Sequence, residues 1–257
     1  MKEPFGSVYA TYYDALYIEK DYEAECDLIE KLLRKYTDGR IDSILDLGCG
    51  TGNHALPLAR RRFQVIGVDR SEFMIEQARK KAAASGRAPA DHFYCADIRS
   101  VDLGREFDAA LMMFAVLGYQ LDNADVLATL RTVRRHLRLR GLLLFDVWYG
   151  PAVLLQRPSE RLKKIATSDG EILRVSSGEL DTRHHSCTVR FHVSKRVGER
   201  IVSETEEEHT VRYFFPLELE VFLESVGFEL LRLGAFPDFE REPDDQIWNV
   251  LCVARAA

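Results

Sequence analysis

The sequence is poor in cysteine, and its cysteines show no paired spacing. Five of them are scattered over 257 residues without any Cys-x-x-Cys, so neither a disulfide framework nor a zinc site is indicated. No apolar run approaches the roughly 20 residues that a membrane-spanning helix needs. The first residues, MKEP, lack the apolar core of a signal peptide. We therefore expect a cytoplasmic protein with no metal and no membrane partner.

A surplus of positive charge is also absent. The net charge is −6 at pH 7 and the sequence pI is about 5.7, which disfavours nucleic acid as a partner unless a local basic patch exists. We find no Ser/His/Asp or Cys/His constellation and no Asn/Asp-Pro-Pro-Tyr motif in the sequence. The usual nucleophilic hydrolases are therefore not indicated.

From about residue 41 the chain alternates apolar strands with amphipathic helices. This alternation predicts a mainly parallel, doubly wound, Rossmann-like α/β sheet, which we expect to have seven strands. The expected strands are 44–47, 63–68, 93–96, 107–114, 142–147, 229–234 and 248–255. The expected helices are 22–36, 53 onward, 72–84, 123–138 and 216–226.

The pattern changes between residues 171 and 213, where polar and apolar residues alternate. Period-two alternation predicts antiparallel strands with one wet face, so we expect an inserted antiparallel β-layer off the main sheet. The chain then divides into an N-terminal helical lid (1–40), a ligand-binding core (41–150), the insertion on the substrate side (151–215) and the end of the core (216–257). We expect a monomer, or a homodimer through the insertion.

A glycine-rich turn directly follows the first expected strand. Gly48, Gly50 and Gly52 permit positive φ angles and close backbone approach to a ligand. Asn53 occupies the place of the last glycine of a dinucleotide fingerprint, which disfavours a pyrophosphate. Asp46 precedes the turn, where its carboxylate can organise the turn amides or a water on a ligand's amino group.

Two more acidic positions follow the next two strands. Asp69 ends the second strand, where a carboxylate can accept hydrogen bonds from both ribose hydroxyls. Asp97 and Ile98 follow the third strand and could read an adenine through the carboxylate and the backbone amide. Turns favour Gly and Asp in any protein, but the coincidence of all three features with strand ends favours an adenosine-containing cofactor.

These residues give the chain a resemblance to the class I S-adenosylmethionine-dependent methyltransferases. ILDLGCGTGNH at 44–54 resembles the first motif of that family, and 65–71 with Met74 resembles the second. Residues 96–98 resemble the third motif. FDAA at 107–110, followed by Met113 and Phe114, resembles the fourth.

A narrower resemblance is to bacterial small-molecule N-methyltransferases, including enzymes that dimethylate nucleotide-linked amino sugars and that also carry an antiparallel insertion at this place. It is carried by Tyr13-Asp14, Tyr17, 21–25, Met113-Phe114, Gly118-Tyr119 and 146–148.

The resemblance implies S-adenosylmethionine as cofactor and S-adenosylhomocysteine as product. It implies a small-molecule acceptor, such as the amine of a nucleotide-linked amino sugar. The residues expected to contact the cofactor are Tyr13, Tyr22, Asp46, Gly48, Cys49, Gly50, Asn53, Asp69, Arg70, Met74, Asp97, Ile98 and Met113. The alternatives left open are an RNA or protein methyltransferase and a non-catalytic protein that binds S-adenosylmethionine.

The acceptor side is less well defined by the sequence. Tyr17, Tyr119 and Trp148 are candidates for contacts with the acceptor, although Trp148 could equally belong to the core. Tyr119 and His209 are the candidate catalytic residues. A phenol with a pKa near 10 is a poor base at neutral pH, so Tyr119 is expected to hydrogen-bond and His209 to act as the base. The tyrosine-rich segment 9–22 is expected to be a mobile lid, or else a helix that only packs.

Overall fold

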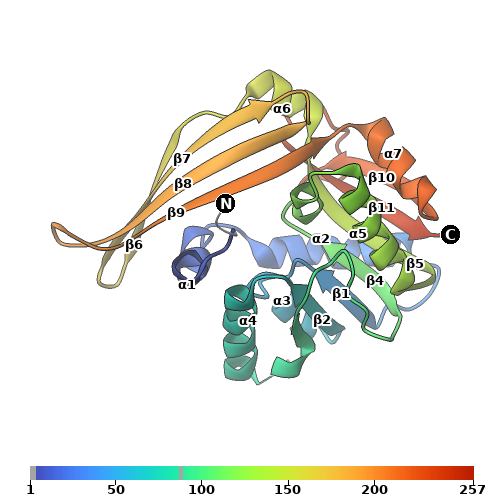
Figure 1. The fold of residues 1–257 in the computed structure, drawn as a ribbon. Coiled ribbons are helices and arrows are strands. Elements are labelled where there is room, and N and C mark those ends of the chain that lie inside the picture. The colour runs from blue at the N-terminus through green and yellow to red at the C-terminus, as the bar shows by residue number, and fades with distance from the viewer. Residues whose placement is uncertain (1–3, 87–88) are drawn as a thin grey trace.

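A curved sheet of 11 strands runs through the part of the chain that the computed structural model describes, residues 4–86 and 89–257 (Figure 1). The strand order is β3-β2-β1-β4-β5-β9-β8-β7-β6, and β11 pairs with β5 and with β10. The Rossmann-like strands are β1 (Ser43–Leu47), β2 (Gln64–Asp69), β3 (Phe93–Cys95), β4 (Phe107–Met112), β5 (Leu137–Tyr149), β10 (Phe228–Ala235) and β11 (Asn249–Ala256).

Helices cover both faces of this Rossmann-like part, so the doubly wound α/β fold is confirmed. One apolar cluster contains buried residues of α5 and α7, and the other contains buried residues of α2, α3 and α4. The helices are α1 (Ser7–Leu16), α2 (Tyr22–Tyr36), α3 (Ala55–Arg60), α4 (Glu72–Ser85), α5 (Asn123–Arg135), α6 (Gly150–Gln156) and α7 (Pro216–Ser225), with short 3₁₀ turns η1 (Ala90–His92) and η2 (Val116–Tyr119). Within the described residues, no helix has the length and apolar character needed to cross a membrane.

The insertion forms four long antiparallel strands, as the alternation predicts, but it is joined to the main sheet. The strands are β6 (Arg161–Thr167), β7 (Gly170–Asp181), β8 (Ser186–Val197) and β9 (Arg200–Phe214). Trp148 and Tyr149 of β5 pair in parallel with Tyr213 and Phe214. The expectation of a layer off the main sheet was wrong, because β4 ends at Met112 and leaves this edge of β5 open for β9.

The N-terminal helix α1 packs beneath the insertion (Figure 1). Its Tyr9, Tyr13 and Leu16 are buried in a third apolar cluster, together with Ile172 and Val193 of the long strands. The insertion and α1 therefore form two walls over the Rossmann-like core, on the side where a ligand can lie between them.

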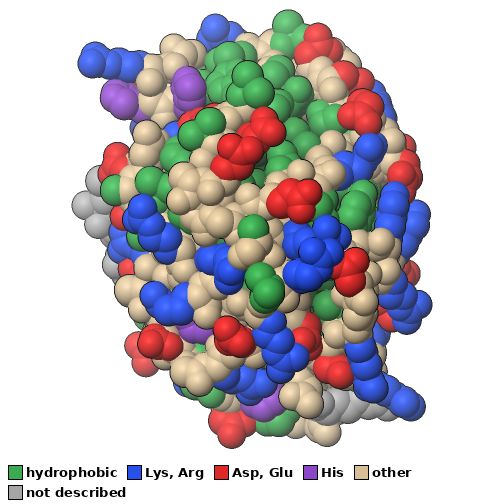
Figure 2. Space-filling model, turned by 90° about the vertical axis from the view of Figure 1, so that its right-hand side faces the viewer, with side chains coloured by type: hydrophobic (Ala, Val, Ile, Leu, Met, Phe, Trp, Pro, Cys, Tyr) green, Lys and Arg blue, Asp and Glu red, His purple; other side chains and the backbone are tan. Residues whose placement is uncertain are grey.

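The face that carries α7 and β10 has mixed charge. Lys and Arg side chains are interspersed with Asp and Glu over most of this face, and hydrophobic side chains gather at its upper end (Figure 2). On this side of the molecule, the positive charges do not form a separate area.

Candidate functional site

A cavity of about 1350 Å³ lies at the carboxyl ends of β1, β2 and β4, and reaches to α1 and to strands β7, β8 and β9. Its volume exceeds the roughly 300–1,000 Å³ of a typical ligand pocket, so it can hold a cofactor and an acceptor side by side. It is lined by nearly all the residues proposed from the sequence: Tyr13, Tyr17, Tyr22, Gly48, Cys49, Gly50, Asn53, Asp69, Arg70, Met74, Asp97, Ile98, Met113, Tyr119, Trp148 and His209.

The glycine turn forms the floor of one end of this cavity. Gly48 and Gly50 have φ angles of +71° and +54°, which glycine adopts without strain. The Gly48 and Cys49 amides donate to the Val68 carbonyl at 2.7 and 3.1 Å. A Cβ on Gly48 would lie 2.5 Å from Cγ2 of Val116, so this position has no room for a side chain.

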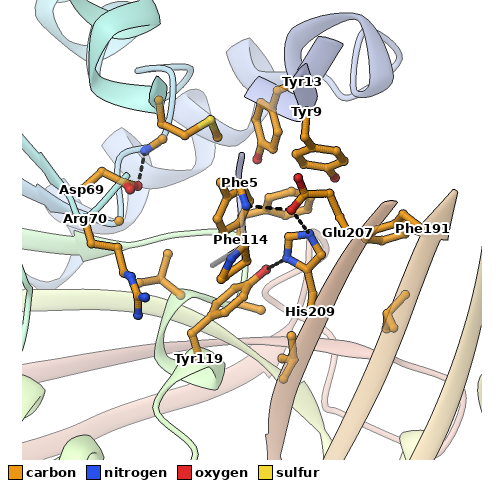
Figure 3. Close-up of a pocket in the computed structure, with 18 of the residues that line it drawn as sticks. Phe5, Tyr9, Tyr13, Asp69, Arg70, Phe114, Tyr119, Phe191, Glu207 and His209 are labelled. Atoms are coloured by element: carbon orange, nitrogen blue, oxygen red, sulfur yellow. Dashed lines mark hydrogen bonds and ion pairs between the residues drawn. The ribbon is translucent and has the colours of Figure 1, made fainter. Parts of the chain in front are cut away.

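The Asp69 carboxylate is fixed beside the turn. Its Oδ2 accepts from the Gly50 amide at 2.9 Å (Figure 3). Its Oδ1 accepts from the Ser71 amide at 2.8 Å. Burial raises the pKa of this carboxyl above its usual value. Because a carboxylate oxygen has two lone pairs, each Asp69 oxygen can still accept a bond from a ligand hydroxyl.

Asp46 lies beneath the turn and is absent from the cavity lining. It is 2% exposed, and its Oδ2 has no hydrogen-bond partner. Burial, and then the charge of Asp69, raise the pKa of Asp46 to about 8. A cationic ligand group above the turn would offset this repulsion and lower that pKa. The orphaned oxygen therefore fits a ligand with an ammonium end, such as a free amino acid moiety.

Two other predicted cofactor residues are held by neighbouring side chains. The Arg99 Nε lies 3.0 Å from both oxygens of Asp97, and this bond lowers the pKa of the Asp97 carboxyl. Arg99 also donates to Asp125 at 2.7 Å. Asn53 donates to Asp14 of α1 at 2.9 Å. Asn53 thus links the glycine turn to the N-terminal helix.

The chain leaves β4 in a strained conformation. Phe114 and Ala115 have φ angles of +74° and +57°, which side-chain-bearing residues rarely adopt. Their amides both donate to the buried carboxylate of Asp146, whose pKa burial raises to about 6. This turn directs the chain into η2, which carries Tyr119. The role of Asp146 in holding this turn was not predicted from the sequence.

The far end of the cavity is built around His209 of β9 (Figure 3). Its Nδ1 lies 3.0 Å from the Tyr119 hydroxyl, and its Nε2 lies 3.8 Å from Oε2 of Glu207. The His209 side chain is buried and its Nε2 has no hydrogen-bond partner. Burial lowers the pKa of His209 to about 4, so the imidazole is neutral at physiological pH.

Glu207 and the N-terminal segment complete this end. The Glu207 carboxylate accepts from the Phe5 and Gly6 amides at 2.9 and 3.1 Å. Glu207 and Phe5 also line the cavity, although neither was predicted from the sequence. Glu207 shares a strand face with His209, because residues two apart in a strand point the same way, and that signal was available in the run Glu206-Glu207-Glu208-His209.

Trp148 lines the cavity, and the centroid of its ring lies 5.6 Å from that of the Trp248 ring. Tyr17 lies between Tyr9, whose hydroxyl is 3.3 Å from its own, and the ring of Phe114. Within the described residues, no group of three or more His, Cys, Asp or Glu is placed to hold a metal ion.

Comparison with known proteins gives one family match and several relatives. Residues 44–141 match the model of a methyltransferase domain. The chain is 32% identical over 246 residues to the putative methyltransferase YqeM of Bacillus subtilis (strain 168). This match covers 93% of this chain and 92% of that protein.

Two further similarities differ in extent. The chain is 32% identical over 145 residues to the dTDP-3-amino-3,4,6-trideoxy-alpha-D-glucopyranose N,N-dimethyltransferase of Streptomyces venezuelae, a match that spans 56% of this chain and only 58% of that relative. The crystal structure of an S-adenosylmethionine-dependent methyltransferase from Clostridium acetobutylicum ATCC 824 has the same fold. It has a TM-score of 0.83, 21% identity, and coverage of 97% of this chain and 98% of that one.

Proposed function

The chain belongs to the class I S-adenosylmethionine-dependent methyltransferases, and on this basis we propose that it methylates the nitrogen of a small-molecule amine bound beside His209. The observation that carries the proposal is the single cavity that joins the glycine turn and Asp69 to Tyr119, Glu207 and His209. Two sites that share one enclosed space are what direct transfer from a donor to an acceptor requires.

The cofactor is S-adenosylmethionine, and we assign its place to the end of the cavity at the glycine turn. When bound, it supplies a methyl group on a sulfonium, whose positive charge is lost on transfer. In this assignment Asp69 accepts from the ribose hydroxyls, and Asp97 with Ile98 faces the adenine. The turn at 48–50 faces the methionine end, above the orphaned oxygen of Asp46. Cys49, Arg70, Met74 and Met113, together with Tyr13 and Tyr22, border the same space.

The acceptor occupies the other end, where His209 receives its proton. With the His209 proton on Nδ1 and shared with the Tyr119 oxygen, Nε2 keeps a free lone pair, which the acceptor reaches when the N-terminal segment around Phe5 opens. An ammonium group gives one proton to Nε2, and the nitrogen lone pair so freed forms the new bond to the methyl carbon. Tyr119 fixes the orientation of the imidazole, while Tyr17 and Trp148 border the space that the rest of the acceptor fills.

The low basicity of His209 is compatible with this step. An α-amine has a pKa of about 8, so transfer of its proton to a group with a pKa of about 4 costs about 5 kcal/mol. A turnover of about one per second corresponds to a total barrier of about 17 kcal/mol. The proton transfer therefore takes roughly a third of the barrier. The Glu207 carboxylate at 3.8 Å favours the imidazolium that forms.

The relatives point to amino sugars as the acceptor class. The similar enzyme of Streptomyces venezuelae is by name an N,N-dimethyltransferase of a nucleotide-linked amino sugar. A screen of amines with ¹³C-methyl-labelled cofactor tests the proposal for this chain. We expect the label in an N-methyl product, identified by its carbon chemical shift. Label found only in O-methyl or C-methyl products, or only in RNA or protein, would contradict it.

Replacing Asp69 with alanine tests the binding site that we assign to the cofactor. Loss of the charge-assisted bonds to the ribose should weaken binding of S-adenosylhomocysteine by about 1.5–3 kcal/mol, measured by titration calorimetry. The variant should also lose stability, because the carboxylate accepts the Gly50 and Ser71 amides.

Asp108 provides the matched control for that variant. It is a buried carboxylate that accepts two backbone amides, of Asp42 and Ser43, both at 2.9 Å, and it does not line the cavity. Asp108→Ala should lower stability while leaving the affinity for S-adenosylhomocysteine unchanged. If both variants bind S-adenosylhomocysteine as the wild type does, Asp69 only forms the turn.

A further inference from the structure

We propose that the His209 end of the cavity is an ammonium-binding subsite, with Glu207 as the anchoring carboxylate, and that it selects unphosphorylated amines over phosphorylated ones. This inference rests on the proposed function and specifies its acceptor. The acceptor inferred here differs in one respect from the substrates of the amino-sugar relatives. Those named substrates carry a nucleoside diphosphate, and the proposed subsite has no group to receive one.

The geometry of Glu207 and His209 suits one nitrogen donor. Oε2 of Glu207 and Nε2 of His209 lie 3.8 Å apart, so a single ammonium nitrogen can stand about 2.9 Å from both, a normal hydrogen-bond distance. Nε2 is buried without a partner in the protein, so an amine reaches it only when the N-terminal segment, whose Phe5 ring lies 4.8 Å from the His209 ring, moves away. An unsatisfied buried polar atom costs about 1–3 kcal/mol, which a bound N–H donor would recover.

Aromatic rings surround the same point. The centroids of Phe5, Phe191 and Tyr9 lie 4.8, 5.3 and 5.5 Å from that of the His209 ring. Aromatic faces attract a desolvated cation by about 0.5–2 kcal/mol each. Carboxylate and rings together therefore favour a small organic cation over a neutral group of the same shape.

The cations that border the cavity are already engaged. Arg99 bonds Asp97 and Asp125, and Arg190 bonds Glu179 and Glu208. The charge of Arg70 acts on two carboxylates: it adds to the lowering of the Asp97 pKa by Arg99, and it partly offsets the rise that burial causes in the Asp69 pKa. No lysine is found among the described residues that line the cavity. A phosphate at this end would be desolvated beside Glu207 without a partner cation, which is strongly unfavourable.

Arg174 is the nearest alternative anion receptor, and it lies outside the lining. Its guanidinium packs over the rings of Tyr17 and Phe191, 5.3 and 5.0 Å from their centroids. Its Nε and Nη1 are buried without hydrogen-bond partners. Both rings belong to residues that line the cavity, whereas Arg174 itself does not.

Binding of a matched series of sugars tests the inference without any methyl transfer. The probes are glucosamine, glucose and glucosamine 6-phosphate, titrated calorimetrically into protein saturated with S-adenosylhomocysteine. We expect glucosamine to bind at least tenfold more tightly than either of the other two. Glu207→Gln should weaken glucosamine binding at least tenfold.

Glu204→Gln is the control on the same strand. Glu204 points to the other face of β9, is exposed, and bonds His192 at 2.5 Å, so its loss should leave glucosamine binding unchanged. Circular dichroism establishes that both variants are folded.

Several results would overturn the subsite. They are tighter binding of glucosamine 6-phosphate than of glucosamine, equal binding of glucose, no binding of glucosamine, or an unchanged affinity in Glu207→Gln. If glucosamine 6-phosphate binds more tightly than glucosamine, and Arg174→Ala abolishes this difference in affinity, Arg174 is the anion receptor. The proposed function fails separately: glucosamine would bind through Glu207, yet the labelled-methyl screen would yield no N-methyl product.

Discussion

Gly48→Ala is expected to abolish measurable binding of S-adenosylhomocysteine and, with it, methyl transfer. The residue has a φ of +71°, where any other residue type is strained by about 1–2 kcal/mol. A Cβ there would stand 2.5 and 2.6 Å from the two methyl carbons of Val116. Contacts this short force η2 away from the turn. Because η2 carries Tyr119, both ends of the cavity should be affected, and affinity should fall at least about 100-fold, the equivalent of about 2.7 kcal/mol.

Gly104→Ala separates the clash from the backbone strain. Gly104 has a similar φ of +61°, but a Cβ there would meet nothing within 4 Å. It should therefore lose a comparable amount of stability from strain and still bind S-adenosylhomocysteine like the wild type. Calorimetric titration of both variants is the measurement. Gly48→Ala protein that binds within threefold of the wild type would show that the turn does not hold the cofactor.

Loss of the His209 imidazole should lower turnover by a factor of about 10²–10⁴, the usual contribution of a positioned acid–base group. His209→Ala removes the only lone pair that the account assigns to the acceptor's proton, and cofactor affinity should change little, since His209 lies at the other end of the cavity. Tyr119→Phe keeps the ring and removes one hydrogen bond, worth about 1 kcal/mol, so turnover should fall only about fivefold.

His184→Ala is the control for a lost histidine. His184 is exposed in the turn between β7 and β8, where it bonds Asp181 at 2.6 Å, and it does not line the cavity. The turnover of the His184→Ala enzyme should equal that of the wild type. A His209→Ala enzyme with more than about a third of wild-type turnover would remove His209 from the chemistry.

The sequence could indicate which residues gather at the cavity end that we assign to the cofactor, because their positions at strand ends are local features. Gly48, Gly50, Asp69 and Asp97 lie at the end of a strand or within three residues after it. Parallel strands bring their carboxyl ends to one edge of the sheet. The α4 helix was equally predictable, since Ser71 caps it by accepting from the Met74 amide. The spacing of these residues could not indicate which carboxylates are already bonded to a neighbouring side chain, as Asp97 is to Arg99.

The acceptor end could not be predicted, because it depends on contacts between distant segments. Glu207 binds the Phe5 amide across 202 residues, and it does so only because β9 docks on the edge of β5. That docking follows from where β4 ends. The start of β5 was also missed: residues 137–141 extend the strand through a register shift beside β4, although their basic residues suit the end of a helix. The exposed strand β6 was also not predicted, because its adjacent lysines, Lys163 and Lys164, interrupt the alternation of polar and apolar residues.

The N-terminal segment illustrates a second limit. Its tyrosines suggested a mobile lid, or else a helix that only packs. In the structure Tyr9 is 1% exposed and Leu16 is fully buried. Burial of one such side chain stabilises by about 1.5–3 kcal/mol, so deletion of residues 1–18 should lower the melting temperature clearly. The opening of this segment remains a prediction, with the Glu207 contacts to Phe5 and Gly6 as the bonds that would break.

The central claim is that an amine enters the cavity as a cation, gives its proton to His209 and receives a methyl group. The most direct test is the pH dependence of kcat/KM for the methylated amine, at saturating cofactor, between pH 7 and 8, above the pKa of about 6 of Asp146. Because burial depresses the pKa of His209 to about 4, its imidazole is neutral and able to accept a proton at every pH in this range. The account predicts a profile that is flat within about threefold up to the pKa of the amine. A tenfold rise per pH unit would mean that the amine must lose its proton to solvent before it binds, and would contradict the claim.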